Sequence, residues 1–454
     1  MVNYHLVILV HGLWGNPAHL QYMESQLTKQ VKAPEGEEII IYKTNSHAGF
    51  LTYDGVDING KRISDEILLQ TNGLNQNDNQ VTKFSIVGYS LGGLISRYAI
   101  GILYSKGYFK AIEPVNFVTF CTPHVGVVNP MHRTLSAFMY NNFVPYFLAH
   151  SGNQMFLKDK VTNHKKPLLV WMSDPNSYFF KSLSRFKYKT LYANVLNDKR
   201  TCWFTASISA TDPYNSIFNR SSLNLSLHYV KGYEPIVVDI NQPGGYEKVT
   251  KEEHAQSKAH QSGFGKCWNW LKLFGTILVF VPLWGIYFML NSVIQRIRLN
   301  SRVKTFFRDT SNNLYHLYDA INEDLTTHGE ETIDDELTLN AQDRTDKYSL
   351  IKTFSNRIQD QQENFVESAY DVMSNNNATI GHQDENSNVP SLNLNDDQMY
   401  IITQLNTLGW KKVPVIIRNT THTHAAAVYR FDQANFEEGK VVIEHFVSES
   451  FPTE

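Results

Sequence analysis

Short apolar runs alternate with amphipathic stretches from residue 1 to about residue 125. The runs are typical of buried parallel strands and lie at residues 5–10, 37–44, 83–90 and 114–124. Helical periodicity marks the stretches between them at residues 17–26, 63–70 and 91–107. Strands that alternate with helices predict an α/β fold with a doubly wound, mostly parallel sheet.

The pattern divides the chain into four parts. Residues 1–233 form a core that includes one more predicted strand at 189–198 and an aromatic-rich lid near 130–165. Residues 398–454 return to strand-like sequence at 411–419 and 425–431 and are expected to complete the same sheet. The two parts in between are an apolar and basic insertion, 234–310, and an acidic, Asn-rich mobile linker, 311–397.

The insertion contains an uncharged apolar run at residues 273–290. As a helix the run would span roughly 27 Å, close to the thickness of the hydrocarbon layer. However, Pro282 and Gly285 stand in its middle, and lysines and arginines flank it on both sides. These features favour a hairpin that enters one leaflet and returns to the cytosolic side. A buried core helix or a hydrophobic lid is the alternative interpretation.

Composition excludes some classes of partner. The formal net charge is −3, and no basic recognition module is present, so we expect no nucleic-acid partner. The cysteines Cys121, Cys202 and Cys267 have no metal-ligand spacing, which indicates a reducing compartment and no metal site. Acylation of Cys267, near the apolar run, stays open. We expect no cofactor, and the N-terminal sequence indicates no secretory signal.

A candidate nucleophile lies in the sequence Gly88-Tyr89-Ser90-Leu91-Gly92, between a predicted strand and a predicted helix. This setting is typical of a nucleophile elbow, in which a sharp turn lifts the serine above the sheet. The tetrahedral intermediate formed at such a serine needs preplaced hydrogen-bond donors. We expect these donors to be the backbone N–H groups of Leu91 and Leu13. Leu13 lies in the glycine-containing loop after the first strand.

The candidate acid and base follow the serine in the order expected of this kind of fold. Asp198 comes directly after a predicted strand, and Asp212 is the alternative acid. His424 is the preferred base, with His422 as the alternative, and we interpret His11 as structural. The His422–His424 pair has no further ligand at metal-binding spacing.

Seven stretches taken in order resemble a known family: VHGLWGN, TYDGVDINGKRISDEI, IVGYSLGGLISRY, CTPHVGV, SGNQMFLKD, YANVLND and THAAAVYR. They begin at residues 10, 52, 86, 121, 151, 192 and 423. Together they are similar to the serine esterase family of lipase-like α/β-hydrolases, in particular to its fungal branch with a lipid-droplet phospholipase. The resemblance implies an α/β-hydrolase fold and a triad of Ser90, His424 and Asp198.

The resemblance also implies a function. We expect a serine hydrolase that cleaves acyl esters of glycerophospholipids, with phospholipid and a lipid monolayer or membrane surface as its partners. The expected location is the cytosol-facing surface of lipid droplets, with the endoplasmic reticulum membrane as a second site. A neutral glyceride lipase, an acyltransferase and a membrane-tethered adaptor with an inactive hydrolase fold are the alternatives.

Overall fold

A computed structural model describes residues 2–76, 78–130, 135–161, 165–195, 198, 200–214, 223–225, 227–241, 246–248, 294, 297, 392–420 and 422–454. The predicted apolar hairpin, 273–290, lies outside these residues. The predicted linker, 311–397, is described only from residue 392 onward.

Six parallel strands form the central sheet in the order β2-β1-β3-β4-β5-β8. Their bounds are β1 Asn3–Val10, β2 Glu37–Lys43, β3 Gln80–Tyr89, β4 Glu113–Phe120, β5 Tyr188–Asn194 and β8 Lys411–Val415. Each coincides with a strand predicted from the apolar runs. A separate antiparallel pair consists of β6 Leu223–Leu225 and β7 Tyr246–Lys248.

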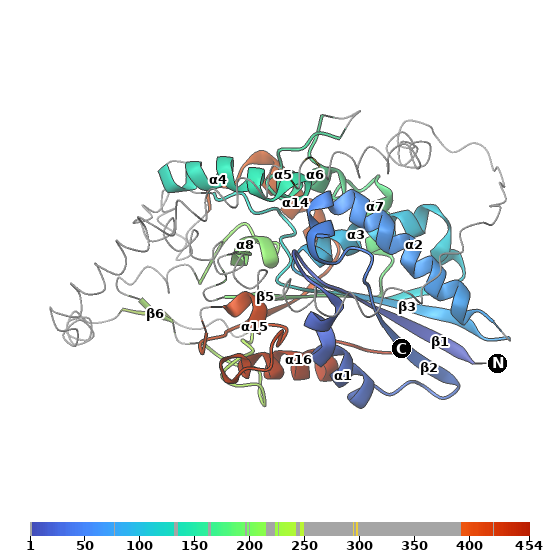
Figure 1. The fold of residues 1–454 in the computed structure, drawn as a ribbon. Coiled ribbons are helices and arrows are strands. Elements are labelled where there is room, and N and C mark those ends of the chain that lie inside the picture. The colour runs from blue at the N-terminus through green and yellow to red at the C-terminus, as the bar shows by residue number, and fades with distance from the viewer. Residues whose placement is uncertain are drawn as a thin grey trace.

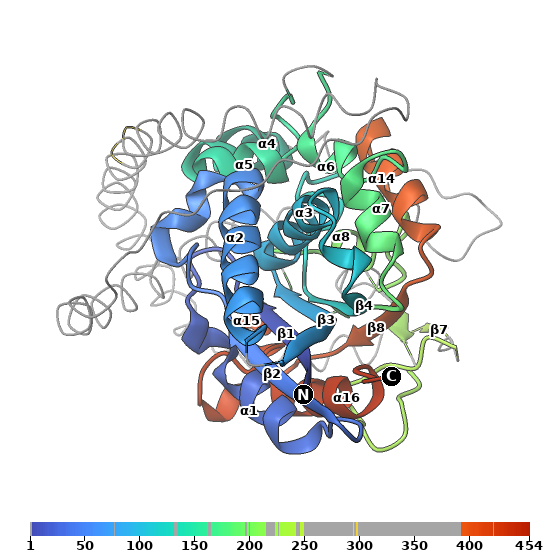
Figure 2. The same cartoon turned by 90° about the vertical axis from the view of Figure 1, so that its right-hand side faces the viewer.

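Helices cover both faces of the sheet, as Figure 1 and the view turned by 90° in Figure 2 show. One face carries α2 Val56–Leu74, α3 Leu91–Ser105 and α7 Tyr178–Ser184. The opposite face carries α1 Gln21–Gln30 and α16 Glu438–Glu449. The side chains of β1 alternate accordingly: Leu6, Ile8 and Val10 belong to the first core, and Val7 and Leu9 to the second. The doubly wound α/β fold predicted from the sequence is therefore confirmed.

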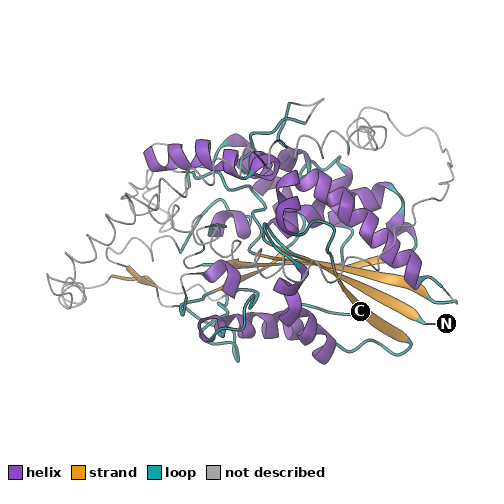
Figure 3. Ribbon diagram, in the orientation of Figure 1, coloured by secondary structure: helices purple, strands orange, loops and turns teal. Residues whose placement is uncertain are grey.

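The remaining helices lie mostly above the carboxyl ends of the strands or connect the layers (Figure 3). They are α4 Leu135–Phe147, α5 Ala149–Met155, α6 Leu168–Trp171, α8 Trp203–Ala206, α14 Asp396–Asn406 and α15 Thr423–Ala426. Short 3₁₀ turns occur at Pro17–Leu20, Gly49–Asp54, Tyr108–Lys110 and Ala434–Phe436.

The C-terminal part of the chain returns to the same sheet. β8 pairs with β5 along five residues, and α16 packs beside α1. The stretch 425–431 is not a strand, contrary to the sequence prediction: it contains the end of α15 and a turn. Three consecutive alanines, which have the highest helix propensity, explain the difference.

Within the described residues, no helix combines the length and the apolar character that a membrane crossing requires.

Candidate active site

Ser90 occupies a sharp turn between β3 and α3. Its backbone has φ 55° and ψ −128°, a region that residues other than glycine rarely adopt. The Ser90 N–H donates to the carbonyl of Phe120 at 2.8 Å, and the Gly93 N–H donates to the carbonyl of Ser90 at 3.1 Å. These bonds hold the strained turn, so the structure has the strand, turn and helix that the sequence predicts.

Glycine is required beside Ser90 because the backbone is crowded there. A Cβ atom on Gly88 would lie 2.4 Å from the Cα of Gly93, and one on Gly92 would lie 2.4 Å from the carbonyl oxygen of Val10. Neither contact can be relieved by moving a flexible side chain. The two glycines of the predicted elbow therefore allow α3 to begin directly against the sheet.

His424 lies between Ser90 and Asp198. Its Nε2 is 2.9 Å from the Ser90 Oγ, and its Nδ1 is 2.9 Å from the Asp198 Oδ2. An ionised Asp198 accepts the Nδ1–H, which leaves Nε2 as the acceptor for the serine hydroxyl proton. The structure thus brings together three residues from distant parts of the chain in the arrangement that activates a serine nucleophile.

The surroundings of Asp198 favour its ionised form. Its Oδ1 accepts the backbone N–H groups of Thr201 at 2.9 Å and Arg200 at 3.1 Å, and its Oδ2 accepts the Asn194 amide at 3.2 Å. Burial alone would raise the pKa of this carboxyl group, but His424 and the hydrogen bonds outweigh it, so that the pKa lies below its usual value. Asp198 can therefore hold the Nδ1–H of His424 and would stabilise a positive charge on that imidazole.

Three supporting side chains were not predicted from the sequence. The hydroxyl of Tyr89 donates to the backbone carbonyl of His424 at 3.1 Å, and the Asn194 amide donates to the carbonyl of Thr423 at 3.0 Å. The Thr201 hydroxyl lies 3.2 Å from His424 Nδ1. Residue spacing carries no signal for contacts of this kind, because they join segments that meet only in the folded chain.

The alternative acid and base lie in other settings. The Oδ1 of Asp212 accepts the backbone N–H of Tyr214 at 3.0 Å within a local turn. His422 is the residue before α15, and its N–H donates to the Thr420 hydroxyl at 3.0 Å. The carboxylate contact of His424 is with Asp198.

The group Cys121, Asp198 and His424 is the one set of potential metal ligands that the described residues bring together, with its ligand atoms within 4.8 Å of one another. Burial first, and then the negative charge of Asp198, raise the pKa of the Cys121 thiol well above its usual value. The thiol therefore keeps its proton, whereas metals bind the thiolate. Asp198 and His424 lie close together because they share a hydrogen bond.

The loop after β1 passes directly beside Ser90. A Cβ atom on Gly12 would lie 2.7 Å from the Ser90 Cβ, so only glycine fits. The turn is closed by the Gly15 N–H to the Gly12 carbonyl at 2.9 Å, and Trp14 has φ 55°. This geometry places the Leu13 peptide next to the nucleophile, while Leu91 is the first residue of α3. Among the described residues, neither N–H donates a hydrogen bond, so both predicted oxyanion donors remain available to a ligand there.

Two buried histidines hold this loop. The rings of His11 and His47 stack with centroids 3.8 Å apart. The Nε2–H of His47 donates to the His11 carbonyl at 3.1 Å, and the Nδ1–H of His11 donates to the Gly12 carbonyl at 3.2 Å. His11 thus supports the backbone beside Ser90 and makes no contact with the serine hydroxyl, in agreement with a structural role.

The buried His11–His47 pair leads to an expected pH dependence of stability. Burial lowers the pKa of His47 to about 4, against about 6.5 in the unfolded chain, so the unfolded chain binds more protons between these values. Stability is full above pH 6.5 and is lost as the pH falls towards 4. We expect His47 alone to lower the free energy of unfolding by about 2 kcal/mol at pH 5 relative to pH 7.

Urea unfolding of the wild type and of His47→Gln at both pH values measures this effect. Glutamine keeps an N–H donor but does not titrate, so the pH dependence of the variant is expected to be smaller by that amount. An equal pH dependence in the two proteins would show that His47 does not carry it.

A pocket with a volume of about 690 Å³, including its open mouth, leads to Ser90. Its walls are mostly apolar and are formed by Leu13, Trp14, Pro123, Val127, Tyr140, Val144, Leu148, Met155 and Phe156. Its polar lining residues include Ser90, Thr201, Arg200, His424 and Arg430. The predicted lid contributes Tyr140 and Val144 through α4, which therefore covers the pocket from one side.

The parallel doubly wound sheet and the serine at the turn after β3 define an α/β-hydrolase. A family model described as "Putative serine esterase (DUF676)" matches residues 2–210. This part of the chain is similar to that serine esterase family, as the sequence motifs indicated.

Curated proteins that are similar to this chain are described as lipases. "Putative lipase C4A8.10" of Schizosaccharomyces pombe is 29% identical over 274 residues, which cover 58% of this chain and 34% of the relative. "Putative lipase ROG1" of Saccharomyces cerevisiae is 34% identical over 224 residues, which cover 48% of this chain and 30% of the relative. The chain therefore spans about a third of the length of these relatives.

A solved structure described as "the gene lin2722 products from Listeria innocua" is 16% identical to the chain, with a TM-score of 0.24. The match covers 42% of this chain and 70% of that one.

Proposed function

We propose that the protein is a serine hydrolase of carboxylic esters, with Ser90 as nucleophile, His424 as general base and Asp198 as the acid of the triad. The observation that carries this proposal is the hydrogen-bonded series from Ser90 Oγ through His424 to Asp198 at the end of an apolar pocket. The match of residues 2–210 to a serine esterase family model and the descriptions of the relatives as lipases support it.

The geometry supports a two-step mechanism. The Ser90 hydroxyl attacks the ester carbonyl while His424 Nε2 takes its proton, and the N–H groups of Leu13 and Leu91 stabilise the resulting oxyanion. His424 then returns the proton to the leaving alcohol, and an acyl-enzyme remains on Ser90. In the second step His424 removes a proton from water, the hydroxide attacks the acyl-enzyme, and the fatty acid leaves as Ser90 regains its proton.

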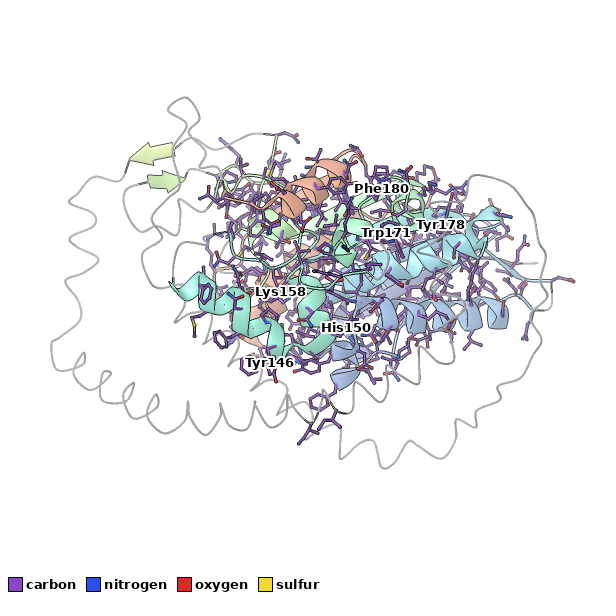
Figure 4. The ribbon with its side chains drawn as sticks, turned by 90° about the horizontal axis from the view of Figure 1, so that it is seen from above. Tyr146, His150, Lys158, Trp171, Tyr178 and Phe180 are labelled. Atoms are coloured by element: carbon purple, nitrogen blue, oxygen red, sulfur yellow. The ribbon has the colours of Figure 1, made fainter. Side chains whose placement is uncertain are left out.

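We further propose that the substrates are acyl esters of glycerophospholipids at a lipid surface. The apolar walls of the pocket suit an acyl chain. Above them, the outer side of α4 exposes Phe138 at 55% and Phe143 at 52%, together with Met139, Tyr146 and Phe147. Seen from above in Figure 4, Tyr146 and Lys158 lie around this helix, and the Lys158 ammonium donates to Asn142 of α4 at 3.0 Å. Aromatic side chains beside a cation are typical of surfaces that enter the lipid interface.

The cellular location that we propose is the cytosol-facing surface of lipid droplets, with the endoplasmic reticulum membrane as a second site. This part of the proposal rests on residues 273–290, which lie outside the described residues, and on the exposed face of α4. Neutral glyceride hydrolysis and acyl transfer use the same triad and are the enzymatic alternatives.

Fatty-acid release from phosphatidylcholine vesicles and from a triglyceride emulsion, with wild type beside Ser90→Ala, tests the proposal. Release from phospholipid by the wild type alone is the expected result. Release from triglyceride alone would change the substrate and keep the mechanism. No release from either by a folded protein would contradict hydrolysis and favour an adaptor, or a transferase when an added alcohol restores turnover.

Phe143 provides a test of the lipid-facing role of α4. Phe143→Asp places a charge on the exposed aromatic side, and burying a phenylalanine at an interface is worth about 1.5–3 kcal/mol. We therefore expect hydrolysis of vesicle lipid to fall about tenfold more than hydrolysis of a soluble, short-chain ester.

Leu69→Asp is the matched control, because Leu69 is an exposed apolar residue on α2 and does not line the pocket. Equal losses on vesicles and on the soluble ester in Phe143→Asp would contradict an interfacial role of α4.

A further inference from the structure

Asn194 lies where two segments of the triad leave the sheet. It is the last residue of β5 and is paired with Val415, the last residue of β8. The segment after β5 carries Asp198, and the segment after β8 carries His424. The side chain of Asn194 is only 2% exposed, so it is buried at the point from which both segments start.

The amide of Asn194 donates to both segments. Its Nδ2 lies 3.2 Å from Asp198 Oδ2 and 3.0 Å from the carbonyl oxygen of Thr423, the residue before His424. The same Asp198 oxygen accepts the Nδ1–H of His424 at 2.9 Å. An amide nitrogen has two N–H donors and both partners are acceptors, so the nitrogen side of the amide faces them. One side chain thus contacts the acid and the backbone that presents the base.

The oxygen of the same amide has no hydrogen-bond partner among the described residues, although Asn194 Oδ1 is buried. A buried acceptor that makes no hydrogen bond lowers stability. A side chain that only filled this space would avoid that cost. The two hydrogen bonds of the amide nitrogen are therefore the contribution that is specific to asparagine at this position.

We propose that Asn194 is a positioning residue of the triad, whose two hydrogen bonds fix Asp198 relative to the segment that carries His424. This inference rests on the proposed ester hydrolysis and adds a residue to its mechanism. Asn194 is not among the described residues that line the pocket, so it acts through Asp198 and Thr423 and not on the substrate. Catalytic geometry tolerates little error, since a displacement of about 1 Å can lower the rate about 100-fold.

The test measures kcat and KM of Asn194→Leu with p-nitrophenyl butyrate, a soluble ester that needs no lipid surface. Leucine has a similar size and removes both donors. We expect kcat to fall about 10- to 100-fold and KM to stay within about twofold of the wild type, because the lost hydrogen bonds hold the triad and not the ester. A raised KM with an unchanged kcat would place Asn194 in substrate binding and overturn the proposal.

Asn116→Leu is the matched control. Asn116 is a buried residue of β4, and its Nδ2 lies 3.1 Å from Ser85 Oγ and 2.8 Å from the carbonyl oxygen of Pro452. Its Oδ1 also has no partner among the described residues, and it is not among those that line the pocket. We expect thermal unfolding to show similar losses of stability in the two variants, and Asn116→Leu to keep the wild-type kcat. Equal losses of kcat would show that stability and not positioning explains the effect.

Asn194→Asp keeps the shape of the side chain and provides a second test if the leucine variant does not fold. A carboxylate has no donor and would repel Asp198, whereas its protonated form can donate one hydrogen bond. We therefore expect the kcat of Asn194→Asp, relative to that of the wild type, to fall as the pH rises. A ratio that stays near one at every pH would contradict the positioning role.

Labelling of Ser90 by a fluorophosphonate, which reacts with activated serines, separates this inference from the proposed function. If the wild type cleaves the ester through Ser90, and both Asn194 variants keep its kcat and its labelling rate, the positioning role is wrong and the hydrolase stands. If the wild type neither cleaves the ester nor is labelled, the proposed function fails, and the positioning role fails with it.

Discussion

Replacing Ser90 by alanine is expected to lower kcat for ester hydrolysis about a millionfold, the size of effect found when a triad serine is removed. The reason is that the acyl-enzyme forms on the Ser90 Oγ, which lies 2.9 Å from His424 Nε2. The pocket and the oxyanion donors remain in place without the hydroxyl, so substrate binding is expected to change much less than kcat. Fatty-acid release under saturating substrate, together with binding of a non-hydrolysable ether lipid, measures both quantities.

The same variant is expected to fold normally. Alanine removes one oxygen atom and keeps the Cβ that already contacts Gly12. The backbone bond from residue 90 to Phe120 does not depend on the side chain. Turnover that persists in a folded Ser90→Ala protein would exclude Ser90 as the nucleophile.

Replacing His424 by alanine is expected to be nearly as damaging, whereas His422→Ala is expected to change kcat by no more than about twofold. His424 contacts both Ser90 and Asp198 and lines the pocket, whereas His422 is not among the described residues that line it. The two substitutions remove the same side chain two residues apart, so each serves as a control for the other. Initial rates of the two variants and the wild type at one pH give the comparison.

The reverse order of the two histidine effects would place the base at His422. Equal, large effects with a lowered melting temperature in both variants would instead indicate that the α15 region had lost its fold, which near- and far-ultraviolet circular dichroism would detect. Such a result would be resolved with the smaller change His424→Gln, which keeps a polar side chain in the same position but cannot accept the serine proton as imidazole does.

The elements that could be predicted from the sequence are those set by local periodicity. The strands of the main sheet coincide with apolar runs, and α3 begins directly after the Gly-x-Ser-x-Gly sequence. The strand predicted at 425–431 is wrong. The stretch is as apolar as a buried strand, but it begins with the alanine-rich end of α15. Local pattern alone does not separate these two possibilities in short apolar runs.

The parts of the candidate site that could not be predicted depend on tertiary contacts. Tyr89 and His424 are 335 positions apart, and His11 and His47 are 36 apart, so neither contact leaves a trace in residue spacing. Ser90, Asp198 and His424 could be proposed because their order and their places at strand ends follow the fold. The lining of the pocket could not, since it comes from segments that meet only in the folded chain.

The long separation between the proposed acid and the proposed base has a consequence for the time at which the proposed triad can form. Asp198 and His424 are 226 positions apart, and β8, which precedes His424, is the last of the described strands along the chain. At a translation rate of about 5–20 residues per second, the serine and the acid leave the ribosome roughly 10–50 s before the base. During that interval the nascent chain has the proposed nucleophile without its proposed proton acceptor, so the proposed ester hydrolysis cannot begin before residue 424 has been synthesised.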